Sequence, residues 1–306
     1  MTAVTQRSAD KAMRAQSETR SQDAHLTLQA RRSTARGVWI GAWAGLSLGI
    51  AAASLSPLVP DAQAHTIMRR EQVCPLDGTR FTATLDGSGT SFGQHLDMKP
   101  FGPTPAPWRL AVCPKDHFVL YQDKFSKEEL DTLRPLIQSP AYQTLAKDHT
   151  EYFLLGKIFE HLKRPPLQTA LVYVKASWQV DTDPVRYAEY AKEALRHYEA
   201  GLAAPDPASR EDSAEERASQ RINAELLVGE LERRLGRFDA ALVRFNRLKN
   251  SPQLKEPILQ AIVAQQLALI AAKDSAPHRI ERPDAKQPTP PPPAPPVVQP
   301  VVVPVT

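Results

Sequence analysis

The spacing of apolar side chains divides the chain into an extended first part and a helical second part. Between residues 126 and 273, apolar positions recur at three- and four-residue steps, which is the period of helices with one buried face. Residues 65–125 are rich in Gly, Pro and Thr instead, and the short runs 80–85 and 117–121 are typical of strands between turns. The pattern predicts an α+β protein in which a small β module is followed by α-helical hairpins.

Capping sequences indicate where several of these helices begin. A Ser or Asp side chain accepts hydrogen bonds from the free N–H groups of a first helical turn, and proline fits that turn because its N–H is not needed there. Four such starts are present: Ser126-Lys127-Glu128-Glu129, Ser139-Pro140, Asp183-Pro184 and Ser213-Ala214-Glu215-Glu216. The period predicts one helix from residue 140 up to Pro165-Pro166, and a last helix over 254–272.

Residues 227–245 resemble a tetratricopeptide repeat, a hairpin of two helices that stacks on similar hairpins. The resemblance implies a glycine where the helices approach closely, a glycine and a phenylalanine at the turn, and an alanine and a phenylalanine inside the second helix. The matching residues are Gly229, Gly236, Phe238, Ala241 and Phe245. Stable arrays need about three repeats, so the hairpins over 139–200 would be degenerate neighbours. A generic helical bundle with the same residues in its core is the alternative.

The two cysteines open matching phrases, which indicates that both fold into the same kind of knuckle. The phrases are Cys74-Pro75-Leu76-Asp77-Gly78 and Cys113-Pro114-Lys115-Asp116-His117. A zinc knuckle has the form Cys-Pro-x-Cys-Gly, because its tight turn directs two thiolates, three residues apart, at one ion. In this chain Asp77 and Asp116 stand where the second thiolate of each knuckle would be.

At these phrases the chain resembles a family of uncharacterised bacterial proteins with paired Cys-Pro-x-Cys knuckles followed by tetratricopeptide-like helices. The resemblance covers roughly residues 72–200, and the two aspartates are this chain's departure from the family pattern. Its most specific pieces are the loop 88–93, the segment 96–100, Pro107-Trp108 and residues 118–125. The resemblance implies a zinc-ribbon-like β module, in which two knuckles face each other, before a TPR-like helical domain.

Knuckles that face each other leave three states open for the cysteines. We favour a disulfide between Cys74 and Cys113, because an oxidising compartment would form it and so small a module needs the support. A metal site is the second state, with zinc as the possible ion and Cys74, Asp77, Cys113, Asp116 and His117 as its ligands. Two free structural thiols are the third. No other cofactor is expected, and without a Cys-x-x-Cys sequence neither thiol is expected to be catalytic.

Both ends of the chain have compositions that do not build a core. Residues 1–36 form a basic leader that we expect to be disordered. Residues 37–64 combine the uncharged stretch 37–55 with Ala62-Gln63-Ala64, as in a signal peptide with its cleavage site; an uncleaved membrane anchor is the alternative. Residues 274–306 contain eleven prolines and are predicted to be a disordered tail. We therefore expect an exported protein of the periplasm or cell envelope, whose only membrane contact would be through the uncleaved stretch.

Charge and motifs narrow the expected function. The chain has 38 basic and 34 acidic residues, and seven of the basic and four of the acidic ones lie in the first 64 positions. The rest of the chain is therefore nearly neutral, and we do not expect it to bind nucleic acid. The glycine-rich loop 88–93 is interpreted as a hairpin connection, because no Lys or helical pattern follows it. We assign no catalytic residue and expect a non-catalytic scaffold or adaptor that binds partner proteins through its helical domain. The alternative is an envelope protein that binds zinc or copper at the degenerate knuckles.

Overall fold

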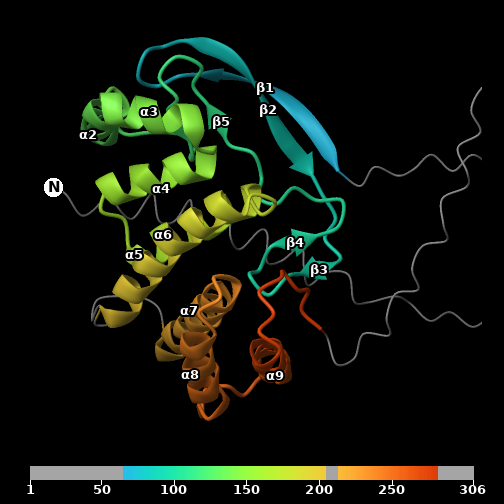
Figure 1. Ribbon diagram of the computed structural model, residues 1–306. Helices are drawn as coiled ribbons and strands as arrows, with labels where there is room; N and C mark the ends of the chain where they lie inside the picture. The colour runs from blue at the N-terminus through green and yellow to red at the C-terminus, as the bar shows by residue number, and fades with distance from the viewer. Residues whose placement is uncertain (1–64, 205–212, 282–306) are drawn as a thin grey trace, which may run out of the picture. The chain divides into compact units, whose positions relative to one another are not determined.

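The computed structural model describes residues 65–204 and 213–281 (Figure 1). Within them the α+β prediction is confirmed, because small antiparallel strand pairs come first and eight helices follow. The predicted leader 1–36, the export segment 37–64 and the tail beyond residue 281 lie outside the described residues. Among the helices that are described, none combines the length and apolar character that crossing a bilayer requires.

Three two-stranded antiparallel sheets make up the β module. Their strands are β1 Thr66–Val73 with β2 Arg80–Ser88, β3 Gly93–Gln94 with β4 Pro100–Phe101, and β5 Ala111–Val112 with β6 Val119–Leu120. The predicted strand at 80–85 lies within β2, and β6 lies within the predicted run 117–121. The sequence does not predict β1, because nearly all of its side chains are exposed and it therefore lacks an apolar alternation.

The helices begin close to the predicted capping residues. They are α2 Lys127–Ile137, α3 Pro140–Asp148, α4 Glu151–His161, α5 Pro166–Gln179, α6 Pro184–Ala203, α7 Ala214–Arg234, α8 Phe238–Lys249 and α9 Pro257–Ala271. The Ser126 hydroxyl accepts a hydrogen bond from the Glu129 N–H at 3.1 Å, and Ser213 and Glu216 exchange both hydrogen bonds of a capping box. The last helix starts later than predicted, at Pro257, a residue that suits a first turn.

The single helix predicted from residue 140 to Pro165 is wrong, because α3 and α4 are separate helices. His149 has an extended backbone (φ −117°, ψ 158°), and Thr150 stands at the N-cap position of α4 with an extended backbone as well. The hydroxyl of Tyr190 in α6 lies 3.0 Å from His149 Nδ1 and accepts a hydrogen bond from the Thr150 N–H at 3.3 Å. A side chain about forty positions further along the chain thus stabilises the break. The periodicity of neighbouring residues therefore does not predict the break.

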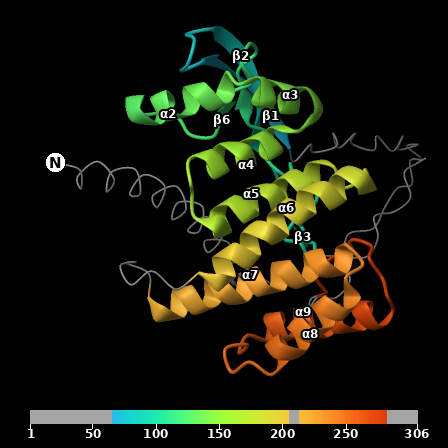
Figure 2. The same ribbon diagram turned by 60° about the vertical axis from the view of Figure 1, so that its left-hand side comes forward.

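Most helices pack chiefly against their neighbours in sequence, with α5 on α6 and α7 on α8 among the most extensive pairs, while α2 packs on both α3 and α4 (Figure 2). Two apolar cores result. The larger core contains the two cysteines, the apolar faces of α2 to α6, and Leu227 and Leu231 of α7. The smaller core contains Leu96, Ile222 and Leu226 with side chains of α8 and α9. Because α7 is buried on two sides, its sequence lacks one clear apolar stripe.

Residues 274–281 belong to the fold, although the sequence analysis assigned them to the tail. The Leu96 N–H donates to the His278 carbonyl at 2.9 Å, and the Ile280 N–H donates to the Gln94 carbonyl at 2.8 Å. The Ile280 side chain also packs against the smaller core. The predicted boundary at residue 274 is therefore too early, because the high proline content of the tail begins only beyond this segment, which contains Pro277 alone.

Candidate functional site

The two cysteine phrases fold into the same turn. In each, the cysteine N–H donates to the carbonyl five residues later, and the N–H four residues later donates back to the cysteine carbonyl. These groups are Cys74 with Thr79 and Gly78, and Cys113 with Phe118 and His117. The fifth residue of each phrase has a left-handed backbone, with φ 73° at Gly78 and 58° at His117. The two similar sequence phrases therefore form equivalent backbone hydrogen bonds.

The paired turns bring the two sulfur atoms together in a disulfide. The Cα atoms of Cys74 and Cys113 are 5.7 Å apart, a separation that suits such a bond. Both side chains are buried, and the bond lies in the larger core together with residues of α2 to α7. Of the three states left open for the cysteines, this geometry corresponds to the first.

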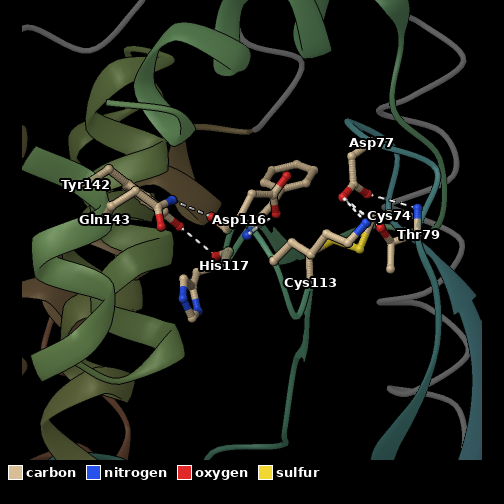
Figure 3. The surroundings of a disulfide bond; sticks show 10 residues. Cys74, Asp77, Thr79, Cys113, Asp116, His117, Tyr142 and Gln143 are labelled. Carbon is tan, nitrogen blue, oxygen red and sulfur yellow. Dashed lines mark hydrogen bonds and ion pairs between the residues drawn. A yellow bond between two sulfur atoms is a disulfide. The ribbon is translucent and has the colours of Figure 1, made fainter. Parts of the chain in front are cut away.

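Asp77 and Asp116, which follow the cysteines by three residues, hold their own turns (Figure 3). Asp77 Oδ1 accepts the Thr79 N–H at 2.9 Å, and its Oδ2 accepts the Thr79 hydroxyl at 2.7 Å. In the same way Asp116 Oδ1 accepts the Phe118 N–H at 3.0 Å. The side-chain and backbone hydrogen bonds from Thr79 lower the pKa of Asp77 below its ordinary value. Both carboxylates therefore have partners within their own knuckles.

A metal ion at the knuckles would require another arrangement. The sulfurs are bonded to each other, so they are not the thiolates that bind zinc. The ring of His117 points away from the disulfide in Figure 3, while the His117 carbonyl accepts a hydrogen bond from the Tyr142 hydroxyl at 3.0 Å. Within the described part of the chain, the five predicted ligands contain no group of three whose ligand atoms are close enough to share an ion.

Helices α2 and α3 hold both knuckles by their backbone carbonyls. Arg134 of α2 donates to the Leu76 carbonyl at 3.0 Å, and Gln143 of α3 donates to the Asp116 carbonyl at 2.8 Å. Burial raises the pKa of the Tyr142 hydroxyl, which therefore remains a donor to the second knuckle. The sequence gives no indication of these three contacts, because their partners lie well apart along the chain.

The residues of the repeat resemblance lie at the hairpin of α7 and α8. A Cβ atom at Gly229 would lie 2.5 Å from the ring of Phe245, so the two helices approach closely there. Ala241 and Phe245 are fully buried on α8. Gly236 has φ 72° at the turn, and Phe238 is partly buried at the start of α8. These positions form one helical hairpin, and both its tetratricopeptide character and an array of repeats stay predictions.

A hydrogen-bonded network around Glu160 joins α4, α5 and α6. Glu160 Oε1 lies 2.8 Å from His197 Nε2, and it accepts hydrogen bonds from Arg196 at 2.5 Å and the Tyr173 hydroxyl at 3.0 Å. Burial alone would raise the pKa of Glu160, but the His197 hydrogen bond, the Lys157 charge and the Tyr173 hydrogen bond outweigh it and lower the pKa to about 2. Glu160 is therefore ionised near neutral pH.

Glu160, Glu193 and His197 have ligand atoms close enough to share a metal ion. However, Lys157 Nζ lies 3.3 Å from a Glu160 oxygen and 3.5 Å from a Glu193 oxygen. Arg196 also pairs with both carboxylates. Two cations beside two carboxylates already balance the charge, so a divalent ion would have to displace them. We interpret the cluster as an ion-pair network that connects α4 with α6.

Two open grooves each include part of this network. The first, of about 500 Å³, is shallow and open to solvent along one face of α6, and its lining residues all belong to that helix: Val185, Glu189, Lys192, Glu193 and Arg196. The second, of about 360 Å³, lies between α2, α3 and α4, where Leu136 and Leu145 face Lys157 and Glu160. The sequence predicted neither groove, because no motif in it marks the exposed residues of these helices.

A model of one bacterial protein family matches residues 104–270, more than half of the chain. The chain belongs to that family, DUF2225, described as an uncharacterized protein conserved in bacteria. The predicted resemblance to an uncharacterised bacterial family is thus confirmed. The matched region contains the second knuckle and all eight helices of the described residues, whereas the first knuckle precedes it. No curated protein and no solved structure matches the chain.

Inside the DUF2225 region, α7 carries charged side chains that are buried. Arg233 donates to the Glu230 carboxylate, to Gln266 Oε1 at 3.0 Å, and to the carbonyls of Asp274 and Ala276. Burial raises the pKa of Glu230 to about 7, against the opposing effects of Arg233 and Gln266. The network fastens the segment after α9 to α7, and the sequence analysis missed it because neighbouring charges usually indicate a solvated face.

Just before the DUF2225 region, Gly89-Thr90-Ser91-Phe92-Gly93 matches the Gly-x-Ser-x-Gly pattern of a nucleophile elbow. In an elbow the serine stands on a turn that leads from a strand into a helix. Here the Ser91 hydroxyl donates to the Gly93 carbonyl at 2.8 Å, and Gly93 begins β3. The loop pairs with residues 101–103 through backbone hydrogen bonds, in agreement with its interpretation as a hairpin connection.

Proposed function

We propose that this DUF2225 protein is a non-catalytic scaffold or adaptor of the cell envelope, which binds partner proteins through its helical domain. The observation that carries the proposal is the open groove along α6, where Val185 is 78% exposed. Beside it the groove presents two acidic and two basic side chains: Glu189, Lys192, Glu193 and Arg196. An apolar contact next to charges of both signs suits a protein segment, since the contact supplies affinity and the charges set its orientation.

The stacking of the helices supports this proposal. Helices that pack on their sequence neighbours build extended surfaces, as repeat proteins do. The contact of Gly229 with Phe245 has a counterpart in α4 and α5, where a Cβ at Gly156 would lie 2.4 Å from the Tyr173 ring. A tetratricopeptide-like array would contain several hairpins with the same contact of a glycine with an aromatic ring. We therefore propose that the helical domain is such an array.

We also propose that the chain is exported and that its β module derives from a zinc ribbon. A buried disulfide persists in an oxidising compartment, and Asp77 and Asp116 lie three residues after the cysteines, where a zinc knuckle would have its second thiolate. His65, the residue after the expected cleavage site, lies 2.9 Å from the buried carboxylate of Asp86, and β1 starts with the next residue. A chain cleaved at this site would retain every strand of the module.

Photo-crosslinking from two valines of similar exposure tests the groove. A photoreactive amino acid is placed at Val185 in the groove or at Val243 on α8, which is 71% exposed, in the full chain expressed in its native bacterium. We expect a defined crosslinked partner from Val185 and none from Val243. With that partner purified, Val185→Asp should weaken binding by about tenfold or more, whereas Val243→Asp should leave it unchanged. Equal products from both positions, or none, would contradict the proposal.

Zinc binding by the reduced knuckles is the second candidate function. It is favoured by the meeting of two sulfurs on matching turns, each with an aspartate three residues later. The test adds zinc to the reduced full chain and measures bound metal by mass spectrometry under native conditions. This candidate expects one zinc per chain, with weaker binding in Asp77→Ala and Asp116→Ala. An unchanged mass, or equal binding in the variants, would exclude it.

A further inference from the structure

Strand β1 has an edge that no other strand covers in the described part of the chain. It pairs only with β2, in a two-stranded sheet. Three of the large apolar side chains that are most exposed lie on it, with exposed fractions of 56% at Ile67, 46% at Met68 and 51% at Val73. A free edge offers unpaired N–H and C=O groups, and a sheet of two strands is marginal alone, so such a strand is suited to pairing with another chain.

One face of β1 carries a pattern that is complementary to itself. Alternate side chains of a strand share a face, so Ile67, Arg69, Glu71 and Val73 lie together. An antiparallel copy of this strand runs in the reverse order, apolar, acidic, basic and apolar. Each Arg69 can then lie opposite Glu71 of the other copy, and each Ile67 opposite Val73, so both ends of the face match at once.

Twofold symmetry restricts this pairing to registers that are centred on one residue, and the charges select among them. Directly opposite residues of an antiparallel pair share a face, so two identical strands related by a twofold axis must pair about a central residue. A centre at Arg69 or at Glu71 places that charge against its own copy and removes the opposite-charge pairs. A centre at Arg70 gives two pairs of Arg69 with Glu71 and two pairs of Ile67 with Val73.

The charges involved are available for this contact. Arg69 has no ion pair among the described residues, and the Glu71 carboxylate accepts a hydrogen bond from the Thr82 hydroxyl but pairs with no cation there. Arg70, which would face its own copy at the axis, has Asp123 of its own chain at 3.7 Å. The repulsion at the axis is thereby reduced, whereas the two cross-strand pairs gain new partners.

We propose that β1 pairs antiparallel with β1 of a second copy of this chain, centred on Arg70, so that two hairpins form one four-stranded sheet. The contact is isologous, because the same strand is used on both sides, and it closes as a dimer. It covers the free edge of both chains and buries the apolar ends of the exposed face.

Charge reversal tests the register. In the exported full chain, Arg69→Glu or Glu71→Arg places like charges opposite each other twice and should weaken the dimer by about tenfold or more. The double variant Arg69→Glu with Glu71→Arg restores both pairs and should dimerise like the natural chain. Mixing the two single variants should give a heterodimer, since Glu at 69 and 71 then faces Arg at both positions. Sedimentation velocity over a concentration series measures each association.

A cysteine crosslink provides an independent test. Arg70→Cys places the new thiol opposite itself at the axis and should give a covalent dimer on mild oxidation, whereas Met68→Cys on the same face is displaced from its copy and should not. The proposal would be overturned if the natural chain remained monomeric at about 100 μM, a concentration far above a micromolar dissociation constant. So would single charge variants that dimerise like the natural chain. If the β1 N–H groups that point away from β2 were protected from hydrogen exchange in the monomer, another segment would cover the edge, and the proposal would also fail.

Discussion

The β module (65–125) and the helical domain (126–273) maintain their folds by different means. In the β module few side chains are buried, and the knuckles are closed by one disulfide and by contacts of their carbonyls with α2 and α3. In the helical domain, large side chains from successive helices fill continuous cores. The disulfide nevertheless lies in the larger core beside residues of α2 to α7. The comparison indicates that the module uses a covalent bond to complete a core that the helices mainly supply.

The largest effect is expected from a side chain of the helical domain. Phe245→Ala removes a fully buried ring that contacts Gly229 and should lower the free energy of unfolding by about 3 to 5 kcal/mol. Urea denaturation followed by circular dichroism measures the change. Val243→Ala on the same helix is the matched control and should stay within about 0.5 kcal/mol. A loss below about 1 kcal/mol for Phe245→Ala would contradict the packing described.

Removal of the disulfide tests the module side of the comparison. Cys74→Ala with Cys113→Ala should lower the free energy of unfolding by about 3 kcal/mol, because the loop between the cysteines is then no longer closed. Hydrogen exchange should increase most in β1 and β2, while α7 and α8 remain protected. Equal exchange across the helices would show that module and domain unfold as one unit, and unchanged stability would contradict a supporting role of the bond.

Stability should depend on pH through Glu230. Burial raises its pKa from 4.5 to about 7, so the folded protein holds this proton more tightly than the unfolded chain does. The resulting stabilisation is complete below pH 4.5 and is lost as the pH rises to about 7, by roughly 3 kcal/mol. Denaturation at a series of pH values measures it.

Glu230→Gln isolates this contribution, because glutamine does not titrate. Burial lowers the pKa values of His95 and His149, and these two groups change stability with pH in the opposite direction. The difference between the natural chain and the variant should therefore follow Glu230. Identical pH profiles for the two proteins would contradict the assignment, and so would a natural chain that loses stability relative to the variant as the pH falls.

The smallest effects compare the two knuckles with each other. Gly78→Ala should destabilise by about 1 kcal/mol, because alanine disfavours the left-handed backbone, while no atom lies within 4 Å of its new Cβ. His117 has a similar backbone with a side chain already present, so His117→Ala should change the free energy of unfolding by less than about 0.5 kcal/mol. Thermal denaturation measures both. Equal losses would show that the two turns differ in more than this residue.

The sequence predicted the features that neighbouring residues determine. Ser126 and Ser213 marked the helix starts through bonds to residues three positions away. The matching phrases at Cys74 and Cys113 indicated matching turns, because each turn is closed within six residues. The fold class followed from the change of apolar period near residue 126, which is also a local property.

Features that depend on distant partners were missed. The break at His149 depends on Tyr190, and the burial of Glu230 and Arg233 depends on Gln266 and on the segment after α9. A row of charges gives no indication of burial when its partners lie about forty residues away. The groove between α2, α3 and α4 was missed for the same reason, because its walls come together only after these helices pack.

Residues 278–280 pack against the β3 region, and this contact determines which part of the chain can complete its folding first. Leu96 is made early, yet its hydrogen-bond partner His278 and its apolar neighbour Ile280 are among the last described residues. During synthesis, which proceeds from the amino end, the β3 hairpin and the smaller core must wait for almost the whole folded part to emerge. The protein therefore cannot complete its first module until the segment that follows its last helix is in place.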